Sequence, residues 1–169
     1  LKDAGFIVRP EDIRRGLEKV YWAGRLEIMA YDPIILLDGA HNPQAIRALV
    51  TTLKKTFPYK ELFTIFGVLQ DKNYGIMIKN FSSLFTNNPV IIVTKPQVPR
   101  GAAVDLVAKE FIKAGQKPII IEDIAKAINY VKDLAAAEDI ICITGSLYTV
   151  AEARKAIKSL GLDILRKAS

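Results

Sequence analysis

Two kinds of hydrophobic pattern alternate along this chain. Short apolar runs, such as Ile-Ile-Leu-Leu at 34–37 and Ile-Ile-Cys-Ile at 140–143, are typical of buried strands. Between them lie longer segments in which apolar residues recur at three- and four-residue spacing, which indicates amphipathic helices. The pattern predicts strands at 26–31, 34–37, 62–68, 90–93, 119–121 and 140–143, and helices at 10–20, 43–57, 74–85, 102–114, 124–137 and 146–160.

This order of elements predicts an α/β fold. Strands that alternate with helices form a mostly parallel sheet covered on both faces, so we expect a Rossmann-like three-layer α/β/α domain with a six-stranded sheet. Residues 26–31 alternate between apolar and polar side chains, and the Asp-Pro turn signal at 32–33 follows them. The first two strands are therefore expected to form an antiparallel hairpin at the edge of the sheet. Residues 1–8 are expected to be a helix end or the tail of a linker.

The composition fits one globular domain with a full core, because the chain has 169 residues and half of them are hydrophobic. No apolar run approaches the roughly 20 residues that span a bilayer. The single cysteine, Cys142, lies in the run 140–143, cannot form an internal disulfide, and fits a buried core residue in a reducing cytoplasm. The net charge of +6 indicates either a solvated basic surface or an anionic ligand such as a nucleotide or a polyacid. Basic residues are scattered along the helices without interleaved aromatics, which disfavours nucleic acid.

The strongest candidate for a binding site is the segment 38–43, Asp-Gly-Ala-His-Asn-Pro, which joins a predicted strand to a helix and contains the only histidine. Open α/β sheets bind their ligands at the carboxyl ends of the strands. Gly39 permits a tight turn and close approach of a ligand, and Asn42 with the proline after it is explained by the helix start. A helix start needs neither Asp38 nor His41. We therefore expect Asp38 to hydrogen-bond a ribose and His41 to contact a phosphate or a transferring group, the alternative for His41 being a capping or exposed residue.

Three other residues extend this candidate site. Arg25 can bind phosphate through two parallel hydrogen bonds, the alternative being a surface ion pair with Glu27. In the turn at 144–146, the backbone and hydroxyls favour an anion at the helix N-terminus, unless Ser146 simply caps that helix. Lys72 follows the predicted strand 62–68 and is expected on the same rim of the sheet, the alternative being a solvated loop without a ligand.

Motifs that would complete a catalytic centre are missing from the sequence. It contains no GxxxxGK[ST] phosphate loop, no GxGxxG turn and no G-x-S-x-G elbow. One histidine and one cysteine give no metal-ligand spacing, so no metal site is expected within the chain. The residues therefore predict ligand binding without a complete active site.

Four segments, in this order, resemble the C-terminal part of folylpolyglutamate synthase, including the bacterial bifunctional dihydrofolate synthase form, within the Mur ligase superfamily. They are Trp-Ala-Gly-Arg-Leu-Glu at 22–27, Leu-Asp-Gly-Ala-His-Asn-Pro at 37–43, Gly-Val-Leu-Gln-Asp-Lys-Asn-Tyr at 67–74 and Ile-Thr-Gly-Ser-Leu-Tyr at 143–148. The resemblance covers the chain from Val20 to its end. Ala23 departs from the usual Trp-Pro-Gly-Arg, with an expected effect on turn rigidity alone.

The resemblance implies an ATP-dependent acid–amino-acid ligase of folate biosynthesis, polyglutamylation and one-carbon metabolism. The full enzyme joins L-glutamate to dihydropteroate or to the glutamate of a folate, through an acyl phosphate. By motif, Arg25, Asp38 and His41 match positions that contact ATP, and His41 is the candidate catalytic residue near the phosphates or the incoming glutamate. Ser146, together with Lys72 as a rim residue, is assigned to the glutamate side.

The resemblance also implies a second domain. A larger N-terminal domain would supply the phosphate loop and the ligands of Mg²⁺. Residues 1–20 would then end the interdomain linker, and residues 21–169 would form the C-terminal domain that closes over ATP. The isolated chain is expected to be inactive and the full protein to be a cytoplasmic monomer, with its own N-terminal domain as a partner and no membrane partner. The alternatives are the C-terminal domain of another Mur-type ligase, acting on cell-wall precursors, and a stand-alone, non-catalytic nucleotide-binding module.

Overall fold

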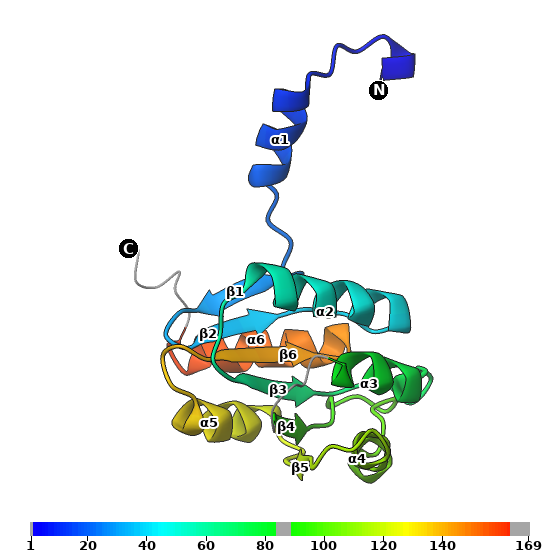
Figure 1. Cartoon of the computed structure of the whole chain (residues 1–169), viewed down its shortest axis with the longest axis vertical. Helices are drawn as coiled ribbons and strands as arrows, with labels where there is room; N and C mark the ends of the chain where they lie inside the picture. Colours follow the sequence, from blue (N-terminus) through cyan, green and yellow to red (C-terminus); the bar gives the residue numbers. More distant parts are fainter. Residues whose placement is uncertain (1, 84–88, 163–169) are drawn as a thin grey trace.

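A six-stranded sheet forms the centre of the molecule. The computed structural model describes residues 2–83 and 89–162. Five neighbouring strands run parallel and β1 runs antiparallel to β2, so the predicted edge hairpin and mostly parallel sheet are confirmed (Figure 1). In spatial order the strands are β1 (Glu27–Ala30), β2 (Ile34–Leu37), β6 (Ile140–Thr144), β3 (Leu62–Phe66), β4 (Val90–Val93) and β5 (Ile119–Ile120).

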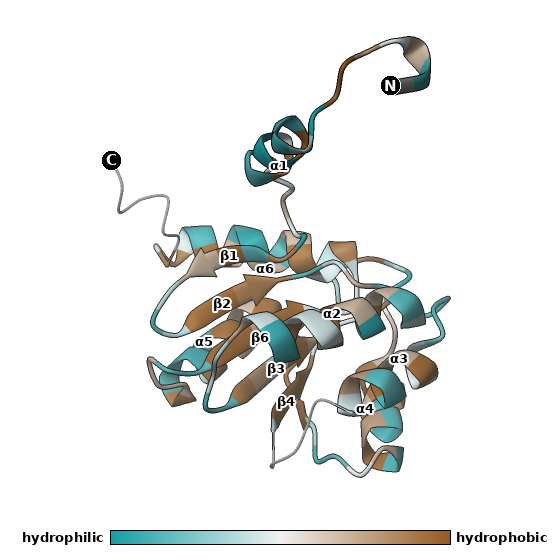
Figure 2. Ribbon diagram, turned by 45° about the horizontal axis from the view of Figure 1, so that its top comes forward, coloured by the Kyte–Doolittle hydropathy of each residue, from teal (hydrophilic) through white to brown (hydrophobic). Residues whose placement is uncertain are grey.

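Helices cover both faces of this sheet. On one face, α2 (Pro43–Thr56), α3 (Tyr74–Ser82) and α4 (Val104–Lys113) pack on a core that contains Leu36, Phe66 and Cys142. On the other face, α5 (Ile124–Leu134) and α6 (Leu147–Ser159) pack on the intervening strand residues, such as Leu37 and Ile65. Both faces of the strands are thus apolar, as Figure 2 shows. The predicted three-layer α/β/α domain and the buried cysteine are confirmed.

Several predicted boundaries were wrong by a few residues, each for a local reason. The predicted helix 124–137 ends at Leu134, because the carboxylate of Asp139 accepts hydrogen bonds from the N–H groups of Ala136 (2.8 Å) and Glu61 (3.0 Å) and turns the chain into β6. The predicted strand 62–68 ends at Phe66, because Phe66 is the last residue of β3 that pairs with the neighbouring strands, opposite Thr144 of β6 and Val93 of β4. The predicted helices 10–20 and 102–114 are realised as α1 (Pro10–Glu18) and α4, and the end of the predicted helix 74–85 lies outside the described residues.

The N-terminal segment lies apart from the sheet. After a short 3₁₀ turn (Lys2–Ala4), α1 stands away from the domain in Figure 1 and has no buried residue. Ile13 and Leu17, one turn apart on α1, are 51% and 69% exposed. Within the described residues, no helix has the length and apolarity needed to cross a membrane.

Candidate functional site

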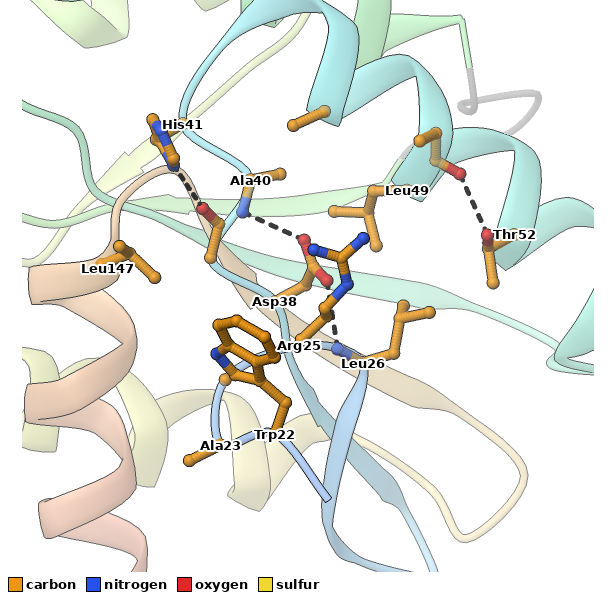
Figure 3. Close-up of a pocket in the computed structure, with 14 residues that line it drawn as sticks. Trp22, Ala23, Arg25, Leu26, Asp38, Ala40, His41, Leu49, Thr52 and Leu147 are labelled. Atoms are coloured by element: carbon orange, nitrogen blue, oxygen red, sulfur yellow. Dashed lines mark hydrogen bonds between the residues drawn. The ribbon is translucent and has the colours of Figure 1, made fainter. Parts of the chain in front are cut away.

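A cavity of about 420 Å³ opens at the carboxyl end of β2. Its walls are the loop 22–26, which precedes β1, the turn 38–41, which follows β2, and one face of α2 (Figure 3). Three of the predicted site residues, Arg25, Asp38 and His41, line this cavity together. The structure thus brings two segments, which the hairpin joins, to one end of the sheet, where α/β sheets bind their ligands.

Asp38 ties the two loops of the site together. Its Oδ2 accepts a hydrogen bond from the N–H of Leu26 at 3.1 Å, and its Oδ1 accepts one from the N–H of Ala40 at 3.0 Å. Burial raises the pKa of Asp38, and these two hydrogen bonds and the nearby Arg25 guanidinium oppose that rise. Each carboxylate oxygen has a second lone pair, so Asp38 can still accept a hydrogen bond from a ligand hydroxyl.

The ring of His41 has a fixed orientation. Its Nδ1 lies 2.8 Å from the carbonyl oxygen of Gly39 (Figure 3). A carbonyl oxygen only accepts, so Nδ1 carries the proton of this bond and the other ring nitrogen, Nε2, is left for a ligand. A neutral ring then offers a lone pair at Nε2, and a protonated ring offers an N–H to an anion. The protonated form therefore suits an anion, and the neutral form suits an N–H or O–H donor.

Arg25 is an exposed cation at the mouth of the cavity. Within the described residues, its guanidinium has no hydrogen bond and no ion pair, and Figure 3 shows it beside Trp22 and Asp38. The alternative of an ion pair with Glu27 was wrong, because the Glu27 carboxylate binds Arg154, with Nε 2.9 Å from Oε1. The guanidinium therefore has donors left for an anionic ligand.

The loop 22–26 is a tight turn. The N–H of Arg25 donates to the carbonyl of Trp22 at 3.1 Å, and Gly24, at the third position, has φ +73°. A positive φ at that position requires glycine in a turn of this kind, and the second position, Ala23 here, is one that favours proline. A Cβ on Gly24 would also lie 2.7 Å from Cγ1 of Val150. Ala23 and Gly24 thus determine the backbone conformation of the turn that ends at Arg25.

A polar cluster behind this loop was missed by the sequence analysis. The Glu27 carboxylate is 6% exposed and accepts hydrogen bonds from the side chains of Tyr21 and Arg154 and from the N–H of Gly24. Burial raises the pKa of Glu27, but these hydrogen bonds outweigh it and hold the pKa below its usual value. Glu27 lies within the motif at 22–27, whereas nothing in the sequence marks Arg154, 127 residues away, as its partner.

Gly39 has a packing role that the sequence did not predict. Its φ is not positive, and a Cβ at this position would lie 2.3 Å from Cδ2 of Leu147. Its N–H donates to the carbonyl of Gly24 at 2.7 Å. The missing side chain therefore makes room for α6 and for the neighbouring loop. Gly39 also lines the cavity, so its role as a point of ligand approach stays a prediction.

Ser146 lies outside the cavity and caps α6. It is 1% exposed, and its Oγ accepts from the N–H of Thr149 at 3.0 Å. The Thr149 hydroxyl donates to the carbonyl of Gly67 at 2.9 Å, so the Ser146 hydroxyl is the donor in the 2.9 Å contact between the two side chains. The hydroxyl of Ser146 is thus occupied within the chain. Of the two interpretations of this turn, the geometry favours the cap.

Lys72 also lies outside the cavity. Its Nζ pairs with Oδ2 of Asp71 at 2.9 Å, in the loop between β3 and α3. Among the described residues, no three His, Cys, Asp or Glu side chains gather as a metal site would require. Arg25, Asp38 and His41 thus lie around one cavity. Ser146 and Lys72, which were predicted for the glutamate side, lie elsewhere on the same rim of the sheet.

A family model described as Mur ligase, glutamate ligase domain, matches residues 24–147. A folylpolyglutamate synthase from Lacticaseibacillus casei is 34% identical over 157 residues, which are 92% of this chain and 34% of that protein. A probable bifunctional folylpolyglutamate synthase/dihydropteroate synthase from Halobacterium salinarum is 34% identical over 148 residues, 87% of this chain and 18% of that protein. The chain therefore spans about a third or less of the length of these relatives.

A solved relative has the same fold. The structure of Mycobacterium tuberculosis folylpolyglutamate synthase complexed with ADP and AMPPCP matches with a TM-score of 0.80 and 27% identity. The match covers 90% of this chain and 36% of that one. The six-stranded sheet with its antiparallel edge is thus shared with that enzyme.

Proposed function

This chain belongs to the family of Mur ligase glutamate ligase domains, and we propose that it is the C-terminal domain of an ATP-dependent folate–glutamate ligase. The observation that carries the proposal is the meeting of Arg25, Asp38 and His41 around one cavity at the end of β2. The relatives named folylpolyglutamate synthase support the folate substrate, and the solved relative with bound ADP and AMPPCP supports the nucleotide. The cavity supplies a cation, a hydrogen-bond acceptor and an oriented imidazole, which are the groups that a nucleotide needs.

Each of the three residues has a role that follows from its geometry. The unpaired guanidinium of Arg25 binds the phosphates of ATP, where it stabilises the charge that develops during transfer. Asp38, with one lone pair left on each oxygen, accepts a hydrogen bond from the ribose. His41 presents Nε2 to the phosphates or to the amine of the incoming glutamate. Only these three enter the proposal, because the hydroxyl of Ser146 is occupied and Lys72 lies outside the cavity.

The remaining chemistry belongs to a second domain. This chain spans about a third of the Lacticaseibacillus casei relative and less of the Halobacterium salinarum relative, and it carries no phosphate loop of its own. A preceding domain would hold the phosphates and the Mg²⁺, and residues 1–20 would connect it to residues 21–169. The exposed Ile13 and Leu17 of α1 fit this proposal, because so short a helix is unstable in water without a packing partner. Closure of the two domains over ATP would exclude water from the acyl phosphate. We expect the whole protein to act as a cytoplasmic monomer.

Two measurements test the proposed function. The first titrates the 169-residue chain with ATP. A half-site should bind in the millimolar range or more weakly, whereas micromolar affinity would identify a stand-alone nucleotide-binding module and overturn the proposal. The second measures ADP release by the chain joined to its preceding domain, with L-glutamate and either dihydropteroate, a folate or a muramyl peptide. Turnover with the muramyl peptide alone would assign the chain to a cell-wall ligase instead.

A further inference from the structure

The buried carboxylate of Glu27 is the centre of a polar cluster that also contains the exposed Tyr21 and the partly exposed Arg154. Nε of Arg154, on α6, lies 2.9 Å from Oε1 and 3.2 Å from Oε2 of Glu27. A second nitrogen of the same guanidinium donates to the hydroxyl of Tyr21 at 2.8 Å, and that hydroxyl donates to Glu27. The N–H of Gly24 completes the set at 2.7 Å. One buried carboxylate is therefore bound by an arginine from the far end of the chain.

This cluster holds the loop 22–26 at three points. Tyr21 precedes the loop, Glu27 follows it, and Gly24 lies at its middle. All three are joined through the Glu27 carboxylate, and Arg154 fastens that carboxylate to α6. Because the loop carries Arg25, the position of the Arg25 guanidinium depends on the cluster.

The loop needs such an attachment because its backbone is strained and poorly packed. Gly24 and Leu26 both have positive φ, +73° and +48°, and for leucine that conformation is unfavourable. Trp22 is 68% exposed. A second hollow of about 470 Å³, lined by Ala23, Gly24 and residues of α6, lies beside the loop. Hydrogen bonds to charged groups, more than burial, therefore hold the loop in place.

We propose that Arg154, acting through Glu27 and Tyr21, is a positioning residue that fixes the loop 22–26 and so aims Arg25 into the cavity. The last step rests on the proposed function, since it takes Arg25 as a phosphate ligand. The loop has other attachments on its far side, where Asp38 accepts from Leu26 and Gly39 donates to Gly24. Removal of Arg154 should therefore loosen the loop without unfolding the domain.

Loop mobility tests the positioning role without any ligand. Backbone amide order parameters of residues 22–26 should fall from about 0.85, typical of rigid backbone, to below about 0.6 in Arg154→Met. Trp22 is the only tryptophan of the chain, so its fluorescence anisotropy should fall as well. Lys155→Met, an exposed neighbour on α6, should change neither quantity. Unchanged order parameters in Arg154→Met would overturn the proposal.

Two further variants guard against a folding defect, because Arg154→Met leaves the Glu27 charge buried without its ion pair. Tyr21→Phe removes one hydroxyl from an exposed ring, and the double variant Glu27→Gln/Arg154→Met contains no unpaired charge. Both should keep the fold and mobilise the loop. A rigid loop in both variants would contradict the positioning role.

Kinetics of the ligase that contains this domain separate the two proposals. Arg154→Met should raise the KM for ATP by about tenfold, the loss of one charge-assisted contact, with a smaller effect on kcat. Arg154→Lys, which keeps the charge, should recover part of the affinity. A mobile loop with an unchanged KM for ATP would leave Arg154 as a positioning residue and remove Arg25 from the nucleotide site. A rigid loop would overturn the positioning role whatever the kinetics show.

Discussion

Two turns at the carboxyl edge of the same sheet differ in what they do with their polar groups. In the turn after β2, the Asp38 carboxylate keeps free lone pairs, Nε2 of His41 is not used by the turn, and both residues line a cavity. In the turn after β6, the Ser146 hydroxyl uses its proton and one of its lone pairs on Thr149, and it is buried. Small and polar residues at a strand end therefore occur both at the candidate binding site and in a turn whose polar groups are bonded within the chain. The two turns differ in whether their polar groups form hydrogen bonds within the chain or remain available to a ligand.

The position of each turn in the sheet explains the difference. β6 lies between β2 and β3, so the turn that follows it is enclosed by its neighbours. A Cβ on Gly145 would lie 2.5 Å from the carbonyl oxygen of Gly67, the residue that follows β3. β2 is next to the antiparallel edge strand, and the loop that leads into that strand leaves a cavity beside it. The antiparallel hairpin thus creates the room that a ligand needs.

The largest effect on stability is expected from a substitution in the turn after β6, at Gly145. Gly145→Ala should lower the free energy of unfolding by about 3 kcal/mol, because the new methyl group meets a backbone oxygen and φ is +107°. Urea denaturation of the chain measures this change. Gly115→Ala is the matched control, since its φ is +80° but nothing lies within 4 Å of the new Cβ, and it should cost about 1 kcal/mol. Equal losses in the two variants would show that close packing at Gly145 contributes nothing.

At the cavity, a substitution in the loop 22–26 should weaken ligand binding and leave the fold intact. Arg25→Ala in the ligase that contains this domain should raise the KM for ATP or lower kcat by at least about tenfold, the effect of losing hydrogen bonds to a charged group. The free energy of unfolding should stay the same, because Arg25 is exposed and forms no ion pair within the described residues. Arg47, exposed on α2 and outside the cavity, supplies the matched Arg47→Ala control. Steady-state kinetics equal to those of the control would remove Arg25 from the site.

Ser146→Ala should have the opposite signature. Loss of the cap should lower the free energy of unfolding by about 1 kcal/mol or somewhat more, since the hydroxyl is buried. Asn42→Ala removes the equivalent cap of α2, where Oδ1 accepts from the N–H of Ala45 at 2.8 Å, and gives the reference for a partly buried site. Thermal unfolding measures both. A fall in kcat or a rise in the KM for glutamate, with normal stability, would return Ser146 to the substrate side.

The sequence predicted the parts of this structure that depend on local pattern. The strands and the edge hairpin follow from short segments of the sequence. The position of Asp38 and His41 follows from the rule that parallel strands end at one edge, whereas Arg25 was grouped with them by the family resemblance. Contacts between distant segments were not predictable. Nothing local pairs Glu27 with Arg154, so the nearer Arg25 was a reasonable but wrong partner.

The two interpretations of Ser146 could not be separated from the sequence either. A serine before a helix has the same sequence pattern whether it caps the helix or binds a ligand. The decision depends on Thr149 and Gly67, whose positions only the fold supplies. The role of Gly39 is similar, because the side chain that occupies its empty space, Leu147, comes from another element.

The smallest effect on stability is expected from a substitution that makes the loop 22–26 more rigid. Ala23 is exposed at the second position of the turn, and no hydrogen bond from its N–H is found within the described residues. Ala23→Pro should therefore raise the free energy of unfolding by about 0.5 kcal/mol, because proline restricts the unfolded chain at a compatible position. Ala40→Pro, in the other loop of the site, is the informative contrast, since its N–H donates to Asp38 and its loss should destabilise the domain. If Ala23→Pro raises the free energy of unfolding and lowers the mobility of the loop, the loop is held by its hydrogen bonds alone and can be made more rigid. A loss at Ala23 would mean that the turn depends on a backbone geometry that proline cannot adopt.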